Sequence, residues 1–187
     1  MTRRWIAAVT AVLLISAAAL LLIHRHTSRF DALIREAAAR HGLDFYLVKA
    51  LIFEESWFRS GIEGPAGERG LMQITAAAAA DYAARRGNPP FRAKSLLEPE
   101  LNVEIGCWYL HQSLERYRDS PQPTLFALLR YNAGESRADA WLRKALSQPP
   151  PQNISRELYY LSLVDFPKTQ TYARRILRRA RTRNYWY

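Results

Sequence analysis

The sequence predicts an all-α domain behind a single N-terminal membrane-spanning helix. Apolar residues recur at helical spacing in almost every segment from about residue 27 onward. No sustained alternation of apolar and polar residues, the pattern of a half-buried strand, interrupts them. The chain also opens with an uncharged run from Trp5 to Ile23, which at about 1.5 Å per residue spans roughly 28 Å, close to the ~30 Å of a bilayer core.

The apolar run predicts the topology of the chain. Arg3 and Arg4 precede it and favour a cytoplasmic N-terminus, since positive charge is retained on that side of the membrane. We therefore expect residues 1–26 to form a single-pass anchor in the inner (cytoplasmic) membrane, and residues 27–187 to form a domain in the periplasm or cell envelope. The alternative is a cleaved signal peptide. Residues 16–19 could supply its cleavage site, but the apolar run continues beyond them.

The first three helices of the domain have clear start or stop signals. The segment 30–41 carries apolar residues at i, i+3, i+4 and i+7 and stops at the following glycine. Asp44 can cap the next helix, which runs to about Trp57. Thr75 then opens an alanine-rich helix that stops at Gly87.

The second half of the chain predicts further helices separated by prolines. Asn102 can cap a helix that runs to about Tyr117, and prolines break the pattern after it. A triple proline at 149–151 indicates a loop. The remaining helical segments are 124–131, 135–146, 155–163 and 169–183. The domain should therefore contain roughly seven to nine helices.

The charge of the chain indicates an anionic partner, because the formal net charge is +10. Six arginines between residues 174 and 183 hold much of it. They favour lipid headgroups or wall polymer as partners, or form a solvated helix face. No helix-turn-helix, RNA-binding aromatic motif or zinc-finger spacing accompanies them, so no nucleic-acid partner is expected. The aromatic residues 185–187 should seal the last helix, with a sugar-stacking or membrane-interface patch as the alternative.

The cysteine and histidine content indicates neither a disulfide nor metal chemistry. Cys107 is the only cysteine and lies within an apolar helical pattern, so we expect a small buried hydrophobic residue. The four histidines show no ligand spacing with each other, and no nucleophile elbow or phosphate-binding glycine loop is present. No metal or cofactor is predicted.

The segment 45–57 carries two adjacent glutamates on an otherwise apolar helix. At about 100° per residue, Glu55 falls in the middle of the apolar stripe centred on Val48, whereas Glu54 falls on its flank. A buried carboxylate is costly unless it is paired or protonated, and burial raises its pKa toward neutrality. Glu55 is thus a candidate general acid with Glu54 as a bystander. The alternative is that Glu55 pairs with one of the many arginines.

A glycine-rich loop follows this helix and ends on a polar amide. Gly61, Gly64, Gly67 and Gly70 predict a bent loop with close backbone approaches. The loop brings Gln73, an uncharged hydrogen-bond donor and acceptor, close in sequence to the glutamate. An acid in an apolar setting beside a polar amide indicates a substrate cleft.

These residues resemble a known family. Glu55-Ser56 followed by Gly70-Leu71-Met72-Gln73 is similar to the signature of the soluble lytic transglycosylase (SLT) domain, glycoside hydrolase family 23. Three later segments resemble further motifs of that family in the same order: 102–110 its N…G…YL helix, 127–141 its A…YNAG…W segment, and 166–172 its closing motif. Together the matches span roughly residues 30–180.

The resemblance implies a lysozyme-like fold and a peptidoglycan lytic transglycosylase that cleaves the MurNAc–GlcNAc β-1,4 bond and leaves 1,6-anhydroMurNAc ends. Glu55 would be the single catalytic acid/base, and Ser56 would help to position its helix or carboxylate. The other matching site residues would be Gly70, Met72, Gln73, Tyr131, Asn132 and Tyr172. The partner would be peptidoglycan glycan strands, and a cell-envelope or secretion complex stays open. The resemblance implies no cofactor.

The implied chemistry needs one carboxylate. Protonated Glu55 donates to the leaving oxygen, and the N-acetyl oxygen of MurNAc stabilises the cationic centre. The ionised glutamate then accepts the C6 hydroxyl proton while an intramolecular attack, favoured by proximity, forms the anhydro sugar. The motif segments offer no obvious second carboxylate, which a retaining glycosidase normally needs as its nucleophile.

Three residues depart from the family pattern. Gly64 stands where a serine is often found, so a side-chain hydrogen bond to substrate would be absent. Lys168 and Gln170 replace the Glu and Arg of the closing motif, and Asp165 is the neighbouring acid that could substitute. These departures concern substrate binding more than the reaction.

Other functions stay open. A goose-type lysozyme-like hydrolase would cut the same bond with water, and product analysis separates it because only a transglycosylase leaves anhydro ends. A catalytically inactive wall-binding or secretion-assembly scaffold is disfavoured by the intact set of Glu55, Gln73, Tyr131 and Asn132. A membrane-anchored nucleic-acid binder would leave the glutamate helix unexplained.

Overall fold

The computed structural model describes residues 2–87 and 89–183, and within them the chain is built from helices with no extended strand. The helices are α1 (Thr2–Ser28), α2 (Asp31–Arg40), α3 (Phe45–Ser56), α4 (Ala76–Arg85), the 3₁₀ helix η1 (Ala93–Leu97), α5 (Pro99–Arg116), α6 (Pro123–Ala133), α7 (Glu135–Ser147), α8 (Arg156–Ser162) and α9 (Pro167–Thr182). The predicted all-α fold class is confirmed. The aromatic end at 185–187, predicted to seal the last helix, lies outside the described residues.

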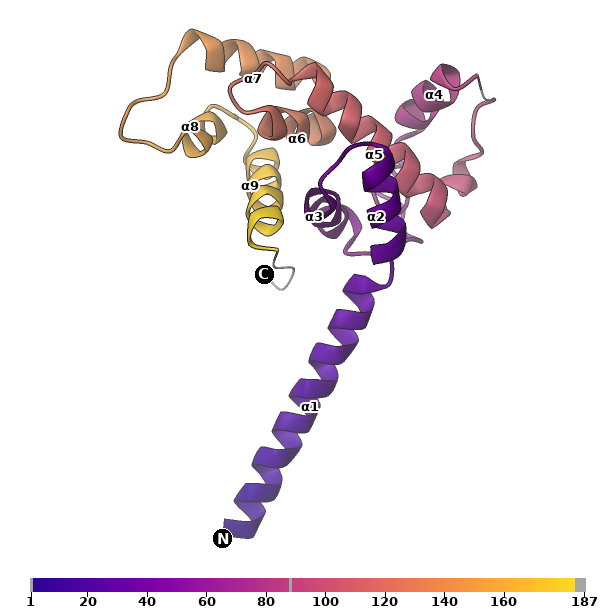
Figure 1. The fold of residues 1–187 in the computed structure, drawn as a ribbon, viewed down its shortest axis with the longest axis vertical. Coiled ribbons are helices and arrows are strands. Elements are labelled where there is room, and N and C mark those ends of the chain that lie inside the picture. Colours follow the sequence, from indigo (N-terminus) through magenta and orange to yellow (C-terminus); the bar gives the residue numbers. More distant parts are fainter. Residues whose placement is uncertain (1, 88, 184–187) are drawn as a thin grey trace.

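Helix α1 stands apart from the rest of the molecule. Figure 1 shows it projecting from the domain as one long helix, whose first turns lie far from every other element. Its apolar residues between Trp5 and Leu22 are exposed. Among the described residues it supplies the segment long and apolar enough to cross a membrane. The long apolar helix is thus confirmed, while its crossing of a membrane stays a prediction.

Two polar contacts join the end of α1 to the turn after α3. His26 Nε2 donates a hydrogen bond to the backbone oxygen of Trp57 at 2.8 Å, and the two rings lie 4.6 Å apart between centroids. The Arg29 guanidinium donates to the backbone oxygen of Phe58. Trp57 and Phe58 both have positive φ angles, of 51° and 59°. The chain therefore leaves α3 through a left-handed turn that the base of α1 contacts.

Helix α3 lies at the centre of the domain and packs against α2 and α9. Asp44 caps it as predicted, accepting a hydrogen bond from the Leu47 amide at 2.8 Å. Its apolar stripe is fully buried at Val48, Leu51 and Ile52. This packing (Figure 1) fixes the direction of the helix. It hence fixes the position of Glu54 and Glu55 in the last turn.

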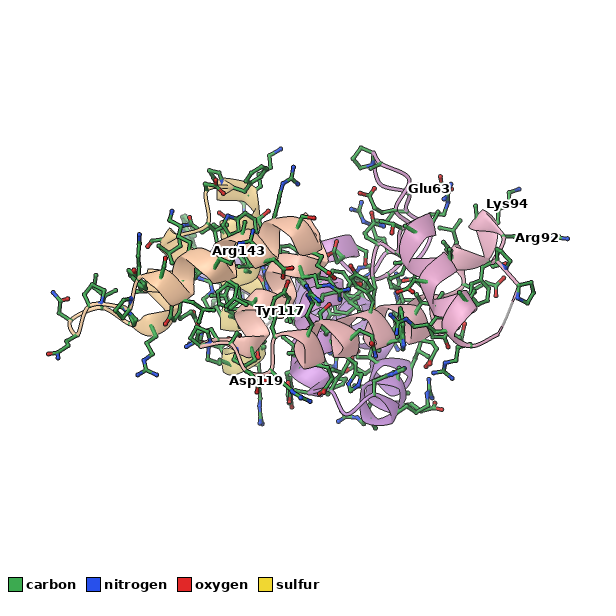
Figure 2. The ribbon with its side chains drawn as sticks, turned by 90° about the horizontal axis from the view of Figure 1, so that it is seen from above. Glu63, Arg92, Lys94, Tyr117, Asp119 and Arg143 are labelled. Carbon is green, nitrogen blue, oxygen red and sulfur yellow. The ribbon has the colours of Figure 1, made fainter. Side chains whose placement is uncertain are left out.

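The other half of the domain is a stack of α5, α6 and α7, with α6 also packed against α9. The predicted burial of Cys107 in α5 is confirmed. Seen from above, the charged side chains of Glu63, Arg92, Lys94 and Asp119 project outward, whereas the buried Tyr117 lies within the domain (Figure 2).

The prediction that Asn102 caps a helix is wrong. Helix α5 begins at Pro99, so Asn102 lies in its first turns and is completely buried. Its side chain accepts a hydrogen bond from the Met72 amide at 2.7 Å, and its amide group donates to the backbone oxygens of Arg69 and Leu96 at 2.7 and 2.6 Å. Asparagine is a residue type common at helix caps, but the Asn102 side chain instead hydrogen-bonds the backbone of the loop after α3.

Proline also begins α6 and α9, at Pro123 and Pro167. From the sequence, Pro123 was predicted to break the helical pattern between two helices. Proline is tolerated in the first turn of a helix, because the amide it lacks has no partner there and its fixed φ suits the helix. The same residue therefore both ends one helical pattern and opens the next.

Candidate active site

Glu55 lies in the last turn of α3, facing α9. The Tyr172 hydroxyl donates a hydrogen bond to Glu55 Oε1 at 2.5 Å. Glu55 is partly exposed to solvent. Within the described part of the chain, no side chain or backbone group donates a hydrogen bond to its Oε2. One carboxylate oxygen is thus held by the protein, and the other remains available to a ligand.

Burial is the main influence on the Glu55 carboxyl and raises its pKa to about 7. The hydrogen bond from Tyr172 acts in the opposite direction, because a donor stabilises the ionised form. The negative charges of Glu54 and Glu68 raise the pKa further, by smaller amounts. At neutral pH this carboxyl can therefore both give and take a proton, which is what a general acid/base requires.

Glu54 is occupied by the arginines of α9. Arg175 Nη1 lies 3.0 Å from Glu54 Oε1, and Arg179 pairs with the second oxygen of the same carboxylate. The side chains of Glu54 and Arg179 are 12% and 7% exposed. The alternative in which an arginine pairs with the catalytic candidate therefore applies to Glu54 instead of Glu55. Through these ion pairs Glu54 joins α3 to α9. That it takes no part in the chemistry stays a prediction.

The loop after α3 places Gln73 in the cleft. Asn102 holds the loop backbone from behind, and Gly70 turns the chain with a φ of 77°. A Cβ on Gly70 would collide with the Asn102 amide, so glycine is required both by the backbone and by the contact. Gln73 follows with a φ of 47°, and its Nε2 donates to the Gly70 oxygen at 3.0 Å.

Three predicted site residues lie behind the cleft wall instead of on its surface. Ser56 is buried and donates to the Ile52 oxygen at 3.1 Å, within its own helix. Gly70 is buried against Asn102. The Met72 side chain is completely buried against Gly106. A Cβ added to Gly106 would overlap the Met72 side chain. These three residues shape the wall through packing, so direct substrate contact by their side chains is not supported.

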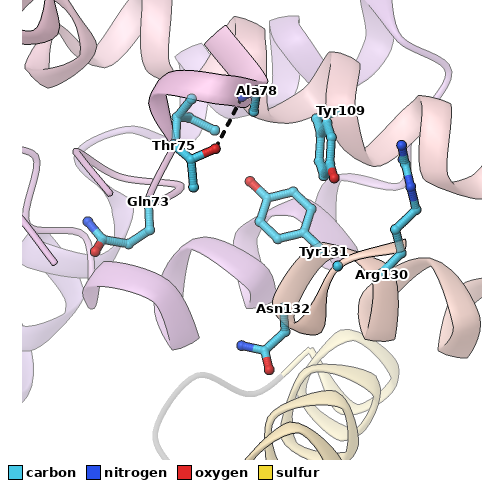
Figure 3. A pocket seen from close by; sticks show the side chains of 9 residues that line it. Gln73, Thr75, Ala78, Tyr109, Arg130, Tyr131 and Asn132 are labelled. Atoms are coloured by element: carbon cyan, nitrogen blue, oxygen red, sulfur yellow. Dashed lines mark hydrogen bonds between the residues drawn. The ribbon is translucent and has the colours of Figure 1, made fainter. Parts of the chain in front are cut away.

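Tyr131 and Asn132, from the end of α6, complete the cleft. The Tyr131 hydroxyl donates to the Met72 oxygen at 2.9 Å, which ties α6 to the loop. Burial raises the pKa of Tyr131 well above its usual value, so the hydroxyl stays protonated. Asn132 Oδ1 accepts a hydrogen bond from Thr169 of α9 at 2.7 Å. Figure 3 shows the Tyr131 ring between Thr75 and Gln73 on one side and Tyr109 on the other.

Two cavities make up this cleft. The larger, of about 250 Å³, is lined by residues that include Tyr109, Arg130 and Gly134, and the smaller, of about 180 Å³, contains Glu55 and Glu68. Both are lined by Gln73, Thr75, Tyr131 and Asn132. They are therefore neighbouring parts of one cleft, and Glu55 lies at one side of it.

Sequence reasoning missed several of these lining residues. Glu68 is the most important, because the motif segments had offered no second carboxylate. Its signal was an acid between two loop glycines, close in sequence to Gln73. Tyr109 and Arg130 were missed as site residues because only the packing of α5 against α6 brings them to the cleft.

The departures in the closing motif have structural explanations. Asp165, considered as a substitute acid, accepts a hydrogen bond from Trp141 Nε1 at 2.7 Å and so is already engaged. Gln170 Nε2 donates to the Leu161 oxygen at 2.8 Å, which joins α9 to α8. Lys168 lines a separate surface depression together with Glu54 and Tyr172. Neither Lys168 nor Gln170 lines the two cavities of the cleft.

Comparison with known proteins identifies the family. Residues 32–153 match the family model described as the transglycosylase SLT domain. The chain belongs to this family. Among curated proteins, the SLT-domain chain is 33% identical over 115 residues to membrane-bound lytic murein transglycosylase F of Desulfosudis oleivorans, and 28% identical over 129 residues to soluble lytic murein transglycosylase of Salmonella typhimurium. These matches cover 60% and 68% of the chain, but only 23% and 19% of those relatives.

Solved structures agree on the fold. An inactive mutant of the lytic transglycosylase Slt from Pseudomonas aeruginosa superposes with a TM-score of 0.67 at 24% identity, over 80% of this chain and 23% of that one. The predicted lysozyme-like fold is thereby confirmed. The SLT-domain chain spans about a quarter or less of the length of these relatives.

Proposed function

We propose that the protein is a peptidoglycan lytic transglycosylase with Glu55 as its single acid/base. The observation that carries the proposal is the Glu55 carboxyl, which has a pKa raised to about 7 and lies in a cleft with Gln73 and Tyr131. The names of the curated relatives, both lytic murein transglycosylases, support the choice of peptidoglycan as substrate. The solved relative described as an inactive mutant carries glutamine in place of glutamate, which is consistent with an essential acid.

The proposed reaction cleaves the MurNAc–GlcNAc β-1,4 bond. Protonated Glu55 gives its proton to the glycosidic oxygen, so that the GlcNAc side leaves as an alcohol. The N-acetyl oxygen of MurNAc stabilises the cationic carbon that remains. The C6 hydroxyl oxygen then bonds to that carbon while its proton passes to the ionised Glu55, which regenerates the acid and leaves a 1,6-anhydroMurNAc end.

Each group in the cleft has a task in this proposal. Tyr172 holds Oε1 of Glu55, so that Oε2 faces the sugar. Gln73 and Asn132 offer amide groups for the sugar hydroxyls and acetamido groups, and Tyr131 offers an apolar ring face. Ser56, Gly70 and Met72 act by shaping the wall behind these groups. Placing the C6 hydroxyl next to the reacting carbon favours it over water, because the attack is then intramolecular.

We further propose that α1 anchors the enzyme in the inner membrane, with the cleft in the periplasm. The exposed apolar surface of α1 and the name of the membrane-bound relative support this location. A partner complex in the cell envelope stays open.

The test is the mass of the muropeptides that the purified full-length protein releases from sacculi. Anhydro ends that disappear in Glu55→Gln would support the proposal. Reducing ends without the anhydro form would indicate a goose-type hydrolase, and release of no muropeptide at all would indicate an inactive scaffold.

A further inference from the structure

A second carboxylate, that of Glu68, lies in the same cavity as Glu55. Glu68 belongs to the loop between α3 and α4, and its backbone oxygen accepts a hydrogen bond from the Gly64 amide at 2.7 Å. Its side chain folds back over this turn, where Oε2 accepts from the Ala66 amide at 3.0 Å. The carboxylate is therefore held in place on the cleft wall by its own loop.

Gly64 provides the space in which the Glu68 carboxylate lies. A Cβ on Gly64 would stand 2.5 Å from Glu68 Oε2 and 2.7 Å from Gln73 Oε1, closer than packed atoms tolerate. The backbone of Gly64 is not left-handed, so the contact alone disfavours a side chain there. The glycine that departs from the family pattern is thus matched to the acid that follows it.

Gln73 turns an acceptor toward the same point. Because its Nε2 donates to the Gly70 oxygen, Oε1 is directed toward Gly64 and Glu68. Glu68 Oε2 and Gln73 Oε1 therefore both lie close to Gly64, and both residues line the smaller cavity beside Glu55. The Ala66 amide is the donor to Glu68 Oε2, and in the described residues no arginine or lysine forms an ion pair with Glu68. The neighbouring Arg69 pairs with Glu63 instead.

We propose that Glu68 and Gln73 Oε1 form a binding site for a hydrogen-bond donor of the glycan, a sugar O–H or an acetamido N–H beside the bond that is cut. Two acceptor oxygens around one space favour a donor between them, and a bond to a carboxylate is stronger than one to a neutral group. The inference rests on the proposed function. It gives Glu68 the task of contacting substrate, with Glu55 alone transferring protons.

The same placement affects proton transfer. Glu55 is surrounded by Glu54 on α3, Glu68 on the loop, Tyr131 on α6 and Tyr172 on α9, and arginines of α9 neutralise only Glu54. The charge on Glu68 raises the pKa of Glu55. Loss of that charge should therefore move the alkaline limb of the activity profile to lower pH, a change that a packing role would not produce.

The test compares Glu68→Ala and Glu68→Gln with Glu63→Gln in the full-length protein. Glu63 lies in the same loop, is 52% exposed and lines neither cavity, so it is the matched control. Binding of a soluble β-1,4-linked N-acetylglucosamine tetramer would be measured in a Glu55→Gln background to prevent turnover. We expect Glu68→Ala to weaken binding about ten- to a hundredfold and raise KM similarly, Glu68→Gln to fall between, and Glu63→Gln to stay within about twofold.

A double-mutant cycle with Gly64→Ala tests the shared space. Gly64→Ala should weaken binding more when Glu68 is present than in Glu68→Ala, because the methyl group displaces both the carboxylate and Gln73 Oε1 in the first case and only Gln73 Oε1 in the second. Additive effects would contradict the inference. Unchanged Kd, KM and pH midpoint in Glu68→Ala would also contradict it. A loss of kcat alone, accompanied by fewer hydrolytic ends, would contradict it as well, because it would indicate that Glu68 is a general base that activates water. Failure of the parent to cleave sacculi would refute the proposed function; a cleaving parent with an indifferent Glu68 would refute only this inference.

Discussion

Tyr172 and Glu55 are 117 positions apart in the chain, yet the tyrosine hydroxyl donates to the glutamate at 2.5 Å. Helices α3 and α9 meet at this bond. The buried tyrosine keeps its proton, because burial and the nearby Glu55 raise its pKa well above the usual value. It is therefore a permanent donor, and it partly offsets the effect of burial on the acid it holds.

We expect Tyr172→Phe to raise the pKa of Glu55 above about 7, because the bond that lowers it is lost while burial remains. The alkaline midpoint of activity should move to higher pH, and kcat should fall about ten- to a hundredfold as the carboxyl loses its orientation. The pH profile of cleavage checks this. Tyr117→Phe is the control, since it also removes a buried hydroxyl from a carboxylate, that of Asp139, away from the cleft. A midpoint that moves to lower pH in Tyr172→Phe would contradict the assignment.

Replacing Glu55 and Glu54 should have separable effects. Glu55→Gln should reduce cleavage of sacculi by at least about a thousandfold while the protein stays folded. Glu54→Gln should keep most activity but lose about 1–3 kcal/mol of stability, because Arg179 is left buried without its ionic partner. Muropeptide release and thermal melting measure the two effects. Equal loss of activity in both variants would refute the division of roles.

The stability of the parent should depend on pH through Glu55. Its folded-state pKa, about 7, exceeds the ordinary value of 4.5, so the folded state holds this proton more tightly than the unfolded state. Stability from this group is complete below about pH 4.5 and is lost as pH rises to about 7, by at most about 3 kcal/mol. Glu55→Gln should therefore melt at or above the parent at pH 8, with a smaller difference at pH 4. A parent clearly more stable at pH 8 would mean that a cation holds Glu55 ionised.

Asn102→Ala should destabilise the domain by about 3 kcal/mol, because the Met72 amide and two backbone oxygens would be left buried without partners. The loop that carries Gln73 should loosen with it, so KM should rise more than the stability loss alone explains. Chemical denaturation and steady-state kinetics measure both. Asn153→Ala, at an exposed asparagine in the loop before α8, is the matched exchange. Unaltered stability in Asn102→Ala would show that the three hydrogen bonds of the Asn102 side chain do not stabilise the domain.

The anchor can be tested with a periplasmic reporter fused after residue 187. We expect the fusion to be active and to stay in the membrane fraction after alkaline carbonate extraction, because the apolar run of α1 matches a bilayer core. Deletion of residues 1–23 should yield a soluble catalytic domain. A soluble form trimmed near Ala19 would instead identify the run as a cleaved signal.

The fold was accessible from sequence because its helices carry local signals, such as the Asp44 cap and the apolar stripe that contains Glu55. Interactions between segments that are distant in the sequence could not be predicted in this way. Asn102 has the chemistry of a cap, and nothing local indicates that a loop 30 residues earlier will use its side chain. Glu54 and Glu55 differ by one position, and only the docking of α9 decides which of them meets the arginines.

The cleft residues likewise divide into those that the sequence predicts and those that only the structure shows. Glu55 and Gln73 were predicted from the helix and loop patterns, Tyr131 and Asn132 were predicted from the resemblance, and the structure brings all four together. Glu68 lies outside the motifs, and its entry into the cleft depends on a missing side chain at Gly64. Such a pair is visible only when both residues are placed in space.

The hydrogen bonds of His26 and Arg29 join the base of α1 to the turn after Glu55. If α1 spans the bilayer as proposed, the height of the cleft above the lipid is set by the protein and not by the excursions of a flexible tether. Such an enzyme could cut only strands that come within one domain's length of the membrane, and from a fixed range of angles. Newly made glycan, before it joins the mature wall, would be within its reach far more often than older layers.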